Sequence, residues 1–197
     1  MHFVLEPTIR REEATVRYAI ETKGSTFTVR AFATGLLATF GHNPTIAAPD
    51  ITGDVFLNPD AVEKSFLRMA FNPSSMMVMD DISEKDRQEI NRRMHEEVLQ
   101  TNSFPEILYE CSRLTASKVG EGQYWIALNG ALTLCGVTRS QPVSARASVN
   151  GDVLRTTGEL SIRQSDYGIP PVSAAGGTIR LKDDLKLSFD ILARKQA

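Results

Sequence analysis

The sequence is poor in the residues that usually carry catalysis or hold a metal ion. It has three histidines and two cysteines, which are His2, His42, His95, Cys111 and Cys135. Neither cysteine has a second cysteine at a metal-binding spacing. No His-x-x-x-His, Gly-x-Ser-x-Gly or phosphate-binding glycine loop occurs. The sequence therefore predicts no catalytic residue, no metal site and no cofactor.

A surplus of basic charge and a long apolar run are also missing. Lys and Arg number 22 and Asp and Glu number 24, so the formal net charge is −2. This excludes a basic surface that would bind nucleic acid through phosphates. No stretch of about 20 apolar residues predicts a transmembrane segment. The apolar run in residues 1–10 is too short for a signal peptide, so we expect a cytoplasmic protein with free thiols.

What the sequence does have is apolar and polar residues in alternation. Side chains in a strand point to opposite faces in turn, so this period indicates antiparallel strands with one buried and one solvated face. The predicted buried positions are Phe27, Val29, Ala31 and Ala33; Ile51, Gly53, Val55 and Leu57; Leu67, Met69 and Phe71; Leu154, Thr156, Gly158, Leu160 and Ile162; and Leu185, Leu187, Phe189 and Ile191.

Turn signals separate these strands. Asn150-Gly151 predicts a tight hairpin in which both residues have positive φ. Gly120-Glu121-Gly122 predicts a turn between strands over 107–118 and 123–134. Asn-Pro steps, at Asn43, Asn58 and Asn72, mark points where a strand is expected to stop.

One segment has helical spacing instead. Ser83 followed by Asp86 resembles a capping box, and Ile90, Met94 and Val98 then recur at the helical period. We expect a helix over Ser83–Gln100 on the outside of the sheet or over its open end. The predicted fold is therefore all-β with one or two short helices, in which residues 1–197 form a single antiparallel barrel domain.

The stretch Leu128–Arg139 is expected to be one strand. Gly130 and Gly136 fall on the same face as Leu128, Leu132 and Leu134. Glycine within a strand marks a bend or a close approach by another group. These glycines leave two alternatives open, which are room for a ligand and simple curvature of the barrel. Cys135 is expected to be a small buried strand residue.

Few polar residues are candidates for a site. His42, in Gly41-His42-Asn43-Pro44, is either a polar contact at a pocket mouth or an ordinary turn residue. Asp166 either orients a ligand head group or caps a turn. His95 is expected to be a solvated residue on the helix. Met69, Met76, Met77 and Met79 suit either a surface for a flexible apolar guest or filler packing.

Several motifs together resemble the YceI-like family of lipid-binding barrels. Leu128–Arg139 resembles that family's Gly-x-Leu-Thr-Leu-x-Gly-Val-Thr-Lys/Arg motif, and Phe104-Pro105-Glu106-Ile107 resembles its segment after the helix. Tyr18-Ala19-Ile20 and Ser25–Val29 resemble the opening strands, Arg163–Ile169 resembles an Arg-x-x-Phe-Gly-Ile region, and Leu185–Ile191 fits the closing strand. The resemblance spans about residues 18–192. It departs from the family at Cys135, where relatives often have His.

This resemblance implies an extended lipocalin-like barrel that holds an isoprenoid, isoprenoid quinone or fatty-acid-like molecule without catalysis. The expected ligand-binding residues are Phe27, Val29, Leu67, Met69, Leu132, Leu134, Leu187 and Phe189, with His42 and Asp166 as candidates for the polar head. Two alternatives stay open, a small-molecule hydrolase or isomerase near His42 and Asp166, and a ligand-free β interaction module. Whether the chain forms a homodimer is also left open.

Overall fold

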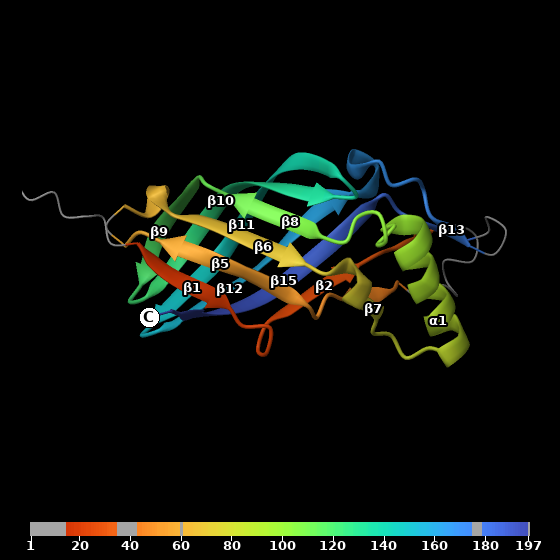
Figure 1. Ribbon diagram of the computed structural model, residues 1–197, viewed down its shortest axis with the longest axis horizontal. Helices are drawn as coiled ribbons and strands as arrows, with labels where there is room; N and C mark the ends of the chain where they lie inside the picture. Colours follow the sequence, from red (N-terminus) through yellow and green to blue (C-terminus); the bar gives the residue numbers. More distant parts are fainter. Residues whose placement is uncertain (1–14, 35–42, 60, 175–178, 197) are drawn as a thin grey trace, which may run out of the picture.

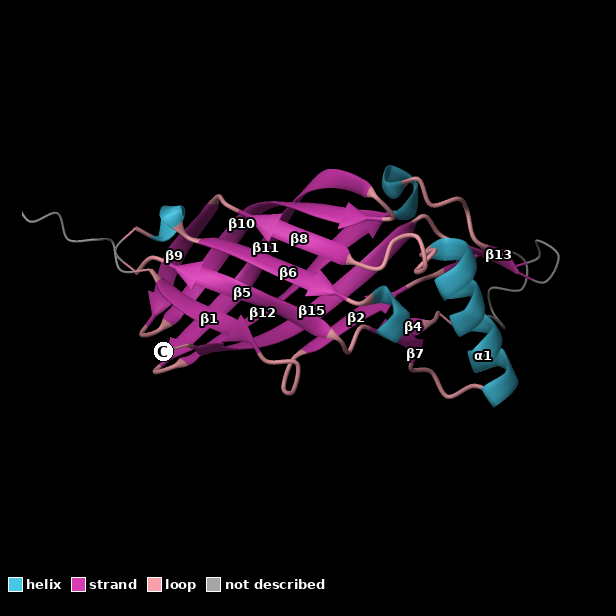
Figure 2. Ribbon diagram, in the orientation of Figure 1, coloured by secondary structure: helices cyan, strands magenta, loops and turns pink. Residues whose placement is uncertain are grey.

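The computed structural model describes residues 15–34, 43–59, 61–174 and 179–196. Strands form the long body of the molecule, and the helical segments lie near its two ends (Figure 2). The strands are β1 Val16–Ile20, β2 Thr26–Arg30, β3 Ala33–Thr34, β4 Thr45–Ala47, β5 Ile51–Leu57, β6 Phe66–Phe71, β7 Met77–Val78, β8 Ile107–Cys111, β9 Leu114–Gly120, β10 Gln123–Leu134, β11 Val137–Asn150, β12 Val153–Arg163, β13 Ser173–Ala174, β14 Ile179–Leu181 and β15 Asp184–Lys195. The helical segments are α1 Glu84–Arg93, a π-helical turn Met94–Val98, and 3-10 turns at Val62–Lys64, Pro73–Ser75 and Gln164–Tyr167.

Within these residues, eight strands close into an antiparallel barrel. The order around the ring is β1-β5-β6-β8-β10-β11-β12-β15, and β15 pairs with β1 to complete it. The predicted antiparallel barrel is thus confirmed. The alternation explains it, because strands that bury one face and wet the other can curl until their apolar faces enclose a lumen.

Some positions in the ring are filled by two shorter strands. Residues 193–195 of β15 pair with β1, whereas residues 186–190 pair with β2. Along β10, residues 123–128 pair with β9 and residues 131–133 pair with β8. The expectation of one strand over 107–118 was therefore wrong, since Ser112 and Arg113 interrupt it. Beyond β2 the sheet continues through β4 to an edge at β7.

The predicted helix is confirmed, and it lies at the end of the barrel opposite the C-terminus (Figure 1). Ser83 is the N-cap, and its Oγ accepts a hydrogen bond from the backbone N–H of Asp86 at 3.1 Å. The same hydroxyl donates to the Asp86 carboxylate. These bonds satisfy a helix donor that would otherwise lack a partner, so the helix begins at this point.

Three side chains of this helical segment hold it against the edge strand β7 and the residues next to that strand. Asn91 Oδ1 accepts from the backbone N–H of Val78 at 3.0 Å, and Arg87 donates to the carbonyls of Val78 and Asp80. His95 Nε2 lies 2.9 Å from the carbonyl oxygen of Met76, so that nitrogen is the donor. The expectation that His95 is a solvated helix residue was wrong, because its ring bonds this backbone.

Leu128–Arg139 is a hairpin rather than one strand. Leu134 pairs with Val137, and the two residues between them form the turn. Cys135 has φ +49° and Gly136 has φ +74°, as a type I′ turn requires. The expectation that Cys135 lies in a strand was wrong. A sequence signal for this turn existed in Gly136, but cysteine is not a usual residue at its first position.

The hairpin at Asn150-Gly151 is confirmed, but its turn is displaced by one residue. Asn150 pairs with Val153, so Gly151 and Asp152 form the loop. Gly151 has φ +56°, whereas Asn150 is not among the residues with positive φ. The expectation of positive φ at both Asn150 and Gly151 was therefore correct for the glycine only.

Candidate functional site

The barrel encloses two apolar cavities along its length. The helix-end cavity, about 520 Å³, lies under α1 and is lined by residues of β2, β4, β7, α1, β10 and β15. The far cavity, about 370 Å³, is lined by residues of β1, β5, β6, β9, β10, β11, β12 and β15. Each volume falls within the range of small-molecule sites in proteins.

Four residues lie between the two cavities, and we call this group the waist. The residues that line both of them are Phe27, Phe71, Leu132 and Leu187. The rings of Phe27 and Phe71 have centroids 4.7 Å apart, and the Phe189 ring stacks on Phe27 at 6.3 Å. The two cavities therefore adjoin at a cluster of aromatic rings.

The eight apolar residues expected from alternation all line these cavities. Val29 and Leu134 line the helix-end cavity; Leu67, Met69 and Phe189 line the far cavity; and Phe27, Leu132 and Leu187 line both. The structure thus brings these side chains together around one lumen. That they contact a ligand stays a prediction.

The two polar candidates are not brought together at this lumen. Asp166 lines neither cavity, and its carboxylate pairs with the guanidinium of Arg163 at 3.1 and 3.2 Å. Its backbone carbonyl accepts from Arg139 Nε at 2.9 Å. The expectation that Asp166 contacts a ligand head has no support in this geometry. His42 lies outside the described residues.

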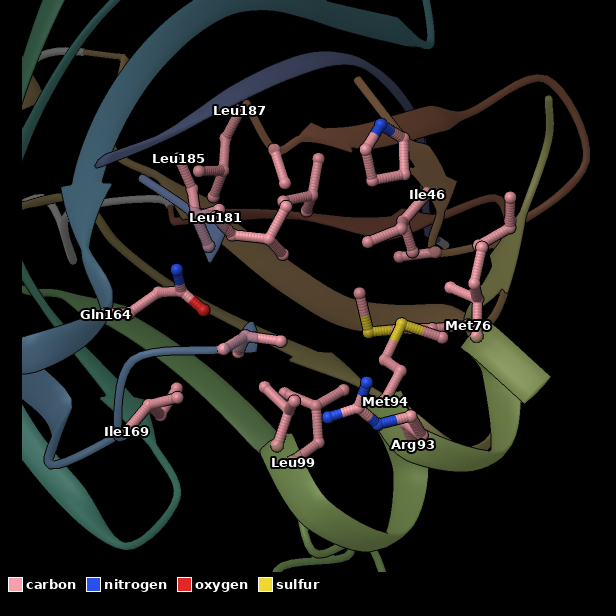
Figure 3. A pocket seen from close by; sticks show the side chains of 18 of the residues that line it. Ile46, Met76, Arg93, Met94, Leu99, Gln164, Ile169, Leu181, Leu185 and Leu187 are labelled. Carbon is pink, nitrogen blue, oxygen red and sulfur yellow. The ribbon is translucent and has the colours of Figure 1, made fainter. Parts of the chain in front are cut away.

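Several polar side chains that the sequence reasoning missed line the helix-end cavity, and Arg93 and Gln164 are two of them. Arg93 donates from Nε to Glu97 at 3.0 Å and from Nη2 to the carbonyl of Ser173 at 2.8 Å. Gln164 is only 5% exposed, and its Nε2 donates to the carbonyl of Lys182 at 3.0 Å. Figure 3 shows both side chains among apolar neighbours that include Met94, Leu181 and Leu185. A signal for Gln164 existed, because it continues the two-residue period of Leu160 and Ile162.

The family model for the YceI-like domain matches residues 17–193, which is most of the chain. The chain belongs to the YceI-like family. The resemblance seen in the sequence motifs is thereby confirmed. None of the curated proteins matches the sequence significantly.

Solved structures show the same fold at low sequence identity. BcnA of Burkholderia cenocepacia has a TM-score of 0.66 at 14% identity, over 88% of this chain and 98% of that one. A polyisoprenoid-binding domain from Saccharophagus degradans, implicated in plant cell wall breakdown, has a TM-score of 0.66 at 12% identity, over 91% and 98%. The YceI protein of Campylobacter jejuni has a TM-score of 0.53 at 14% identity, over 80% and 88%.

Gly130 of this YceI-like barrel makes room for a side chain of the protein itself. A Cβ on Gly130 would lie 2.5 Å from the ring and hydroxyl of Tyr109 and 2.6 Å from the carbonyl oxygen of Glu110. The hydroxyl of Tyr109 donates to the backbone carbonyl of Gln141 at 3.1 Å, and burial raises its pKa. The group that approaches Gly130 closely is therefore the Tyr109 ring, so at this glycine the space is taken by the protein rather than left for a ligand.

The thiol of Cys135 in this YceI-like chain faces the end of the helical segment. Its Sγ lies 3.6 Å from the carbonyl oxygen of Val98 and 3.7 Å from that of Leu99. Burial raises the pKa of this thiol, and burial also raises the pKa of Cys111. A thiol with a raised pKa stays protonated at neutral pH and is a poor nucleophile. Cys135 thus joins the turn to the helical segment rather than presenting a reactive sulfur.

The methionines divide between the lumen and the surface. Met69 lines the far cavity and Met76 the helix-end cavity, whereas Met77 and Met79 are exposed. Across the part of the chain that is described, no group of three His, Cys, Asp or Glu side chains could hold a metal ion. The same residues contain no helix that is long and apolar enough to span a membrane.

Proposed function

We propose that this protein binds a long apolar ligand in the barrel lumen, to carry or sequester it without chemical change. The observation that carries the proposal is the pair of apolar cavities that adjoin at the Phe27–Phe71 waist. A lumen that is long and narrow suits a flexible tail better than a compact molecule. An isoprenoid, an isoprenoid quinone or a fatty-acid-like molecule has such a tail.

The physics of burial is sufficient for useful affinity. Burying about 400 Å² of an apolar tail at roughly 25 cal/mol per Å² gives on the order of 10 kcal/mol. Loss of translational freedom and ordering of the tail remove several kcal/mol of that. A lumen lined mainly by side chains such as Val29, Leu67 and Leu187 can therefore hold a tail with few polar contacts.

The relatives support the isoprenoid class within this proposal. The Saccharophagus degradans domain, which shares this fold, is described as polyisoprenoid-binding. At 12% identity the likeness concerns the fold, so the ligand class comes to this chain as an inference. The cytoplasmic location expected from the sequence is likewise a prediction, which cell fractionation would test.

The two alternatives have less support. A hydrolase or isomerase site needs an acid or base within reach of a bound substrate. The carboxylate of Asp166 pairs with Arg163 and lines neither cavity. A ligand-free interaction module would be favoured by a lumen filled with side chains, and cavities of about 520 and 370 Å³ argue for a ligand instead.

The test is to identify what the protein holds. Protein purified without detergent is examined by native mass spectrometry, and bound molecules are extracted with organic solvent and identified. Emptied protein is then titrated with geranylgeraniol. We expect one prenyl molecule per chain and saturable binding. A protein that is empty in repeated preparations and binds no prenyl molecule would overturn the proposal.

A further inference from the structure

Gln164 presents a hydrogen-bond acceptor to the helix-end cavity. The carbonyl oxygen of Lys182 can only accept, so the group of Gln164 that faces it at 3.0 Å must be the amide nitrogen. The amide oxygen Oε1 therefore points the other way, toward the space between the labelled side chains in Figure 3. Among the described residues, no donor gives a hydrogen bond to this oxygen.

The backbone of Gln164 is fixed by two hydrogen bonds, and this limits where its side chain can lie. The N–H of Gln164 donates to the carbonyl of Asp183 at 3.0 Å, and its carbonyl accepts from the N–H of Ile169 at 3.2 Å. With Nε2 bound to Lys182 as well, the side chain has little freedom to turn its oxygen elsewhere. An acceptor that is fixed before binding loses little conformational entropy when a donor arrives.

The side-chain oxygen of Gln164 is open to an apolar cavity rather than sealed among protein atoms. The side chains of Ile162, Ile169 and Leu181 line the same cavity, so the oxygen sits in a mainly apolar space. Among the described residues, no side-chain nitrogen or oxygen is both fully buried and without a partner, so this oxygen keeps access to the cavity. A ligand that covers this oxygen with an acceptor-only head leaves it buried and unpaired, which is destabilising, whereas a hydroxyl hydrogen pairs it.

The charged side chains that line the same cavity indicate whether the head group of the ligand is charged or neutral. Asp80, Asp86 and Glu89 line this end together with a single arginine, Arg93. Three carboxylates against one guanidinium disfavour an anionic head such as a phosphate or a carboxylate. The head that fits both observations is uncharged and carries a hydroxyl group.

We infer that Gln164 accepts a hydrogen bond from the polar end of the ligand, and that the lumen prefers a long-chain alcohol to the same tail with an acceptor-only head. This inference rests on the proposed function, because it concerns the ligand of the same lumen. It assigns to Gln164 the role of selecting the head group, while the apolar walls select the tail.

The experiment compares geranylgeraniol with its methyl ether, which has the same tail and an oxygen that cannot donate. Full-length protein is titrated with each molecule, and the ratio of the two dissociation constants is measured. We expect the alcohol to bind about three- to tenfold more tightly, as one net hydrogen bond provides. In Gln164→Met, which keeps the length but removes the acceptor, we expect the ratio to fall to about one.

The matched control is Ile169→Leu, which changes an apolar wall residue of the same cavity and should leave the ratio unchanged. Loss of packing weakens the binding of both molecules alike. The ratio of the two dissociation constants therefore distinguishes a lost acceptor from a structural effect. If Gln164→Met does not fold, the carbon signal of the Gln164 amide carbonyl in wild-type protein decides. It should shift with the alcohol and not with the ether.

Each outcome is decisive. Equal binding of both molecules by wild-type protein would overturn the role of Gln164 and leave the proposed function standing. A preference for the alcohol that persists in Gln164→Met, or an unmoved carbonyl signal, would also overturn it. If neither molecule binds, the proposed function itself fails.

Discussion

The rings of Phe27 and Phe71 pack at 4.7 Å between centroids, with their planes 59° apart, where the two cavities of the barrel meet. The two residues come from β2 and β6, which are not neighbours in the sheet. They therefore meet across the lumen rather than along it, and they lie between its two halves.

Removing one of these rings should widen the passage. For Phe27→Ala we expect a loss of about 3 kcal/mol in the free energy of unfolding, because a large aromatic side chain leaves a cavity. We also expect longer prenols to gain affinity relative to geranylgeraniol, since the tail can pass freely into both halves. Urea denaturation and binding titrations measure the two effects.

The control for this change is Phe56→Ala. Phe56 stacks on Phe66 at 4.4 Å and lines neither cavity. The Phe56→Ala substitution removes an aromatic pair away from the waist, so the preference for tail length should stay as in the wild type. A Phe27→Ala protein with an unchanged preference would contradict the assignment of Phe27 to the waist.

The attachment of the helix to the edge strand can be weakened at one residue. In Asn91→Ala the backbone N–H of Val78, a residue that is 2% exposed, loses its acceptor. A buried donor without a partner costs about 1–3 kcal/mol, and we expect a loss of that size in chemical denaturation. Amide hydrogen exchange at Val78 should accelerate. Gln88→Ala, on the exposed side of the same helix, should change neither quantity.

The turn at Cys135 offers a stabilising substitution. Its φ of +49° is unfavourable for most residues, and Asn-Gly is the pair that this turn type prefers. We expect Cys135→Asn to stabilise the protein by about 0.5–1 kcal/mol through relief of this strain. Cys135→Ala keeps a residue that disfavours positive φ, so it should not stabilise. A lower melting temperature for Cys135→Asn than for Cys135→Ala would contradict this account.

The buried thiols predict how stability depends on alkaline pH. Burial raises the pKa of Cys111 and Cys135 above the ordinary value of 9.0. As the pH rises through that value, the unfolded chain releases these protons while the folded protein keeps them. The unfolded state then binds fewer protons, so the free energy of unfolding falls with rising pH.

Urea denaturation at intervals from pH 8 to 9.5 measures this fall, before the lysines begin to titrate. Cys135→Ala removes one of the two thiols, so its stability should decline less steeply over the same range. A wild-type protein whose stability is constant across this interval would show that its thiols ionise alike in the folded and unfolded states.

The sequence predicted much of the lumen, because side-chain alternation is a local property. Val29, Leu67 and Leu187 face the interior wherever their strands lie, so no knowledge of the pairing was needed to place them. Ser83 likewise indicated the start of the helix, because its bond to Asp86 spans only three residues.

The remaining features depend on partners that are distant in the sequence. The waist arises because the folded barrel brings Phe27 opposite Phe71, and the break between β8 and β9 becomes visible only in their pairing with β10. Cys135 was misplaced because a cysteine rarely adopts positive φ, and tertiary packing overrides that preference here. Gln164 was missed because an inward-facing polar residue interrupts the apolar pattern that marked the lumen.

The side-chain attachment of helix α1 has a consequence for how a tail could enter. Around most of the barrel, neighbouring strands are joined by rows of backbone hydrogen bonds, and separating them would break a whole row. Among the described residues, the helical segment is joined to its neighbours through hydrogen bonds of side chains, which are those of Arg87, Asn91, Arg93, His95 and Cys135. Lifting the helix would break these side-chain bonds and leave every strand pair of the barrel intact, so a tail that enters at this end separates no strands.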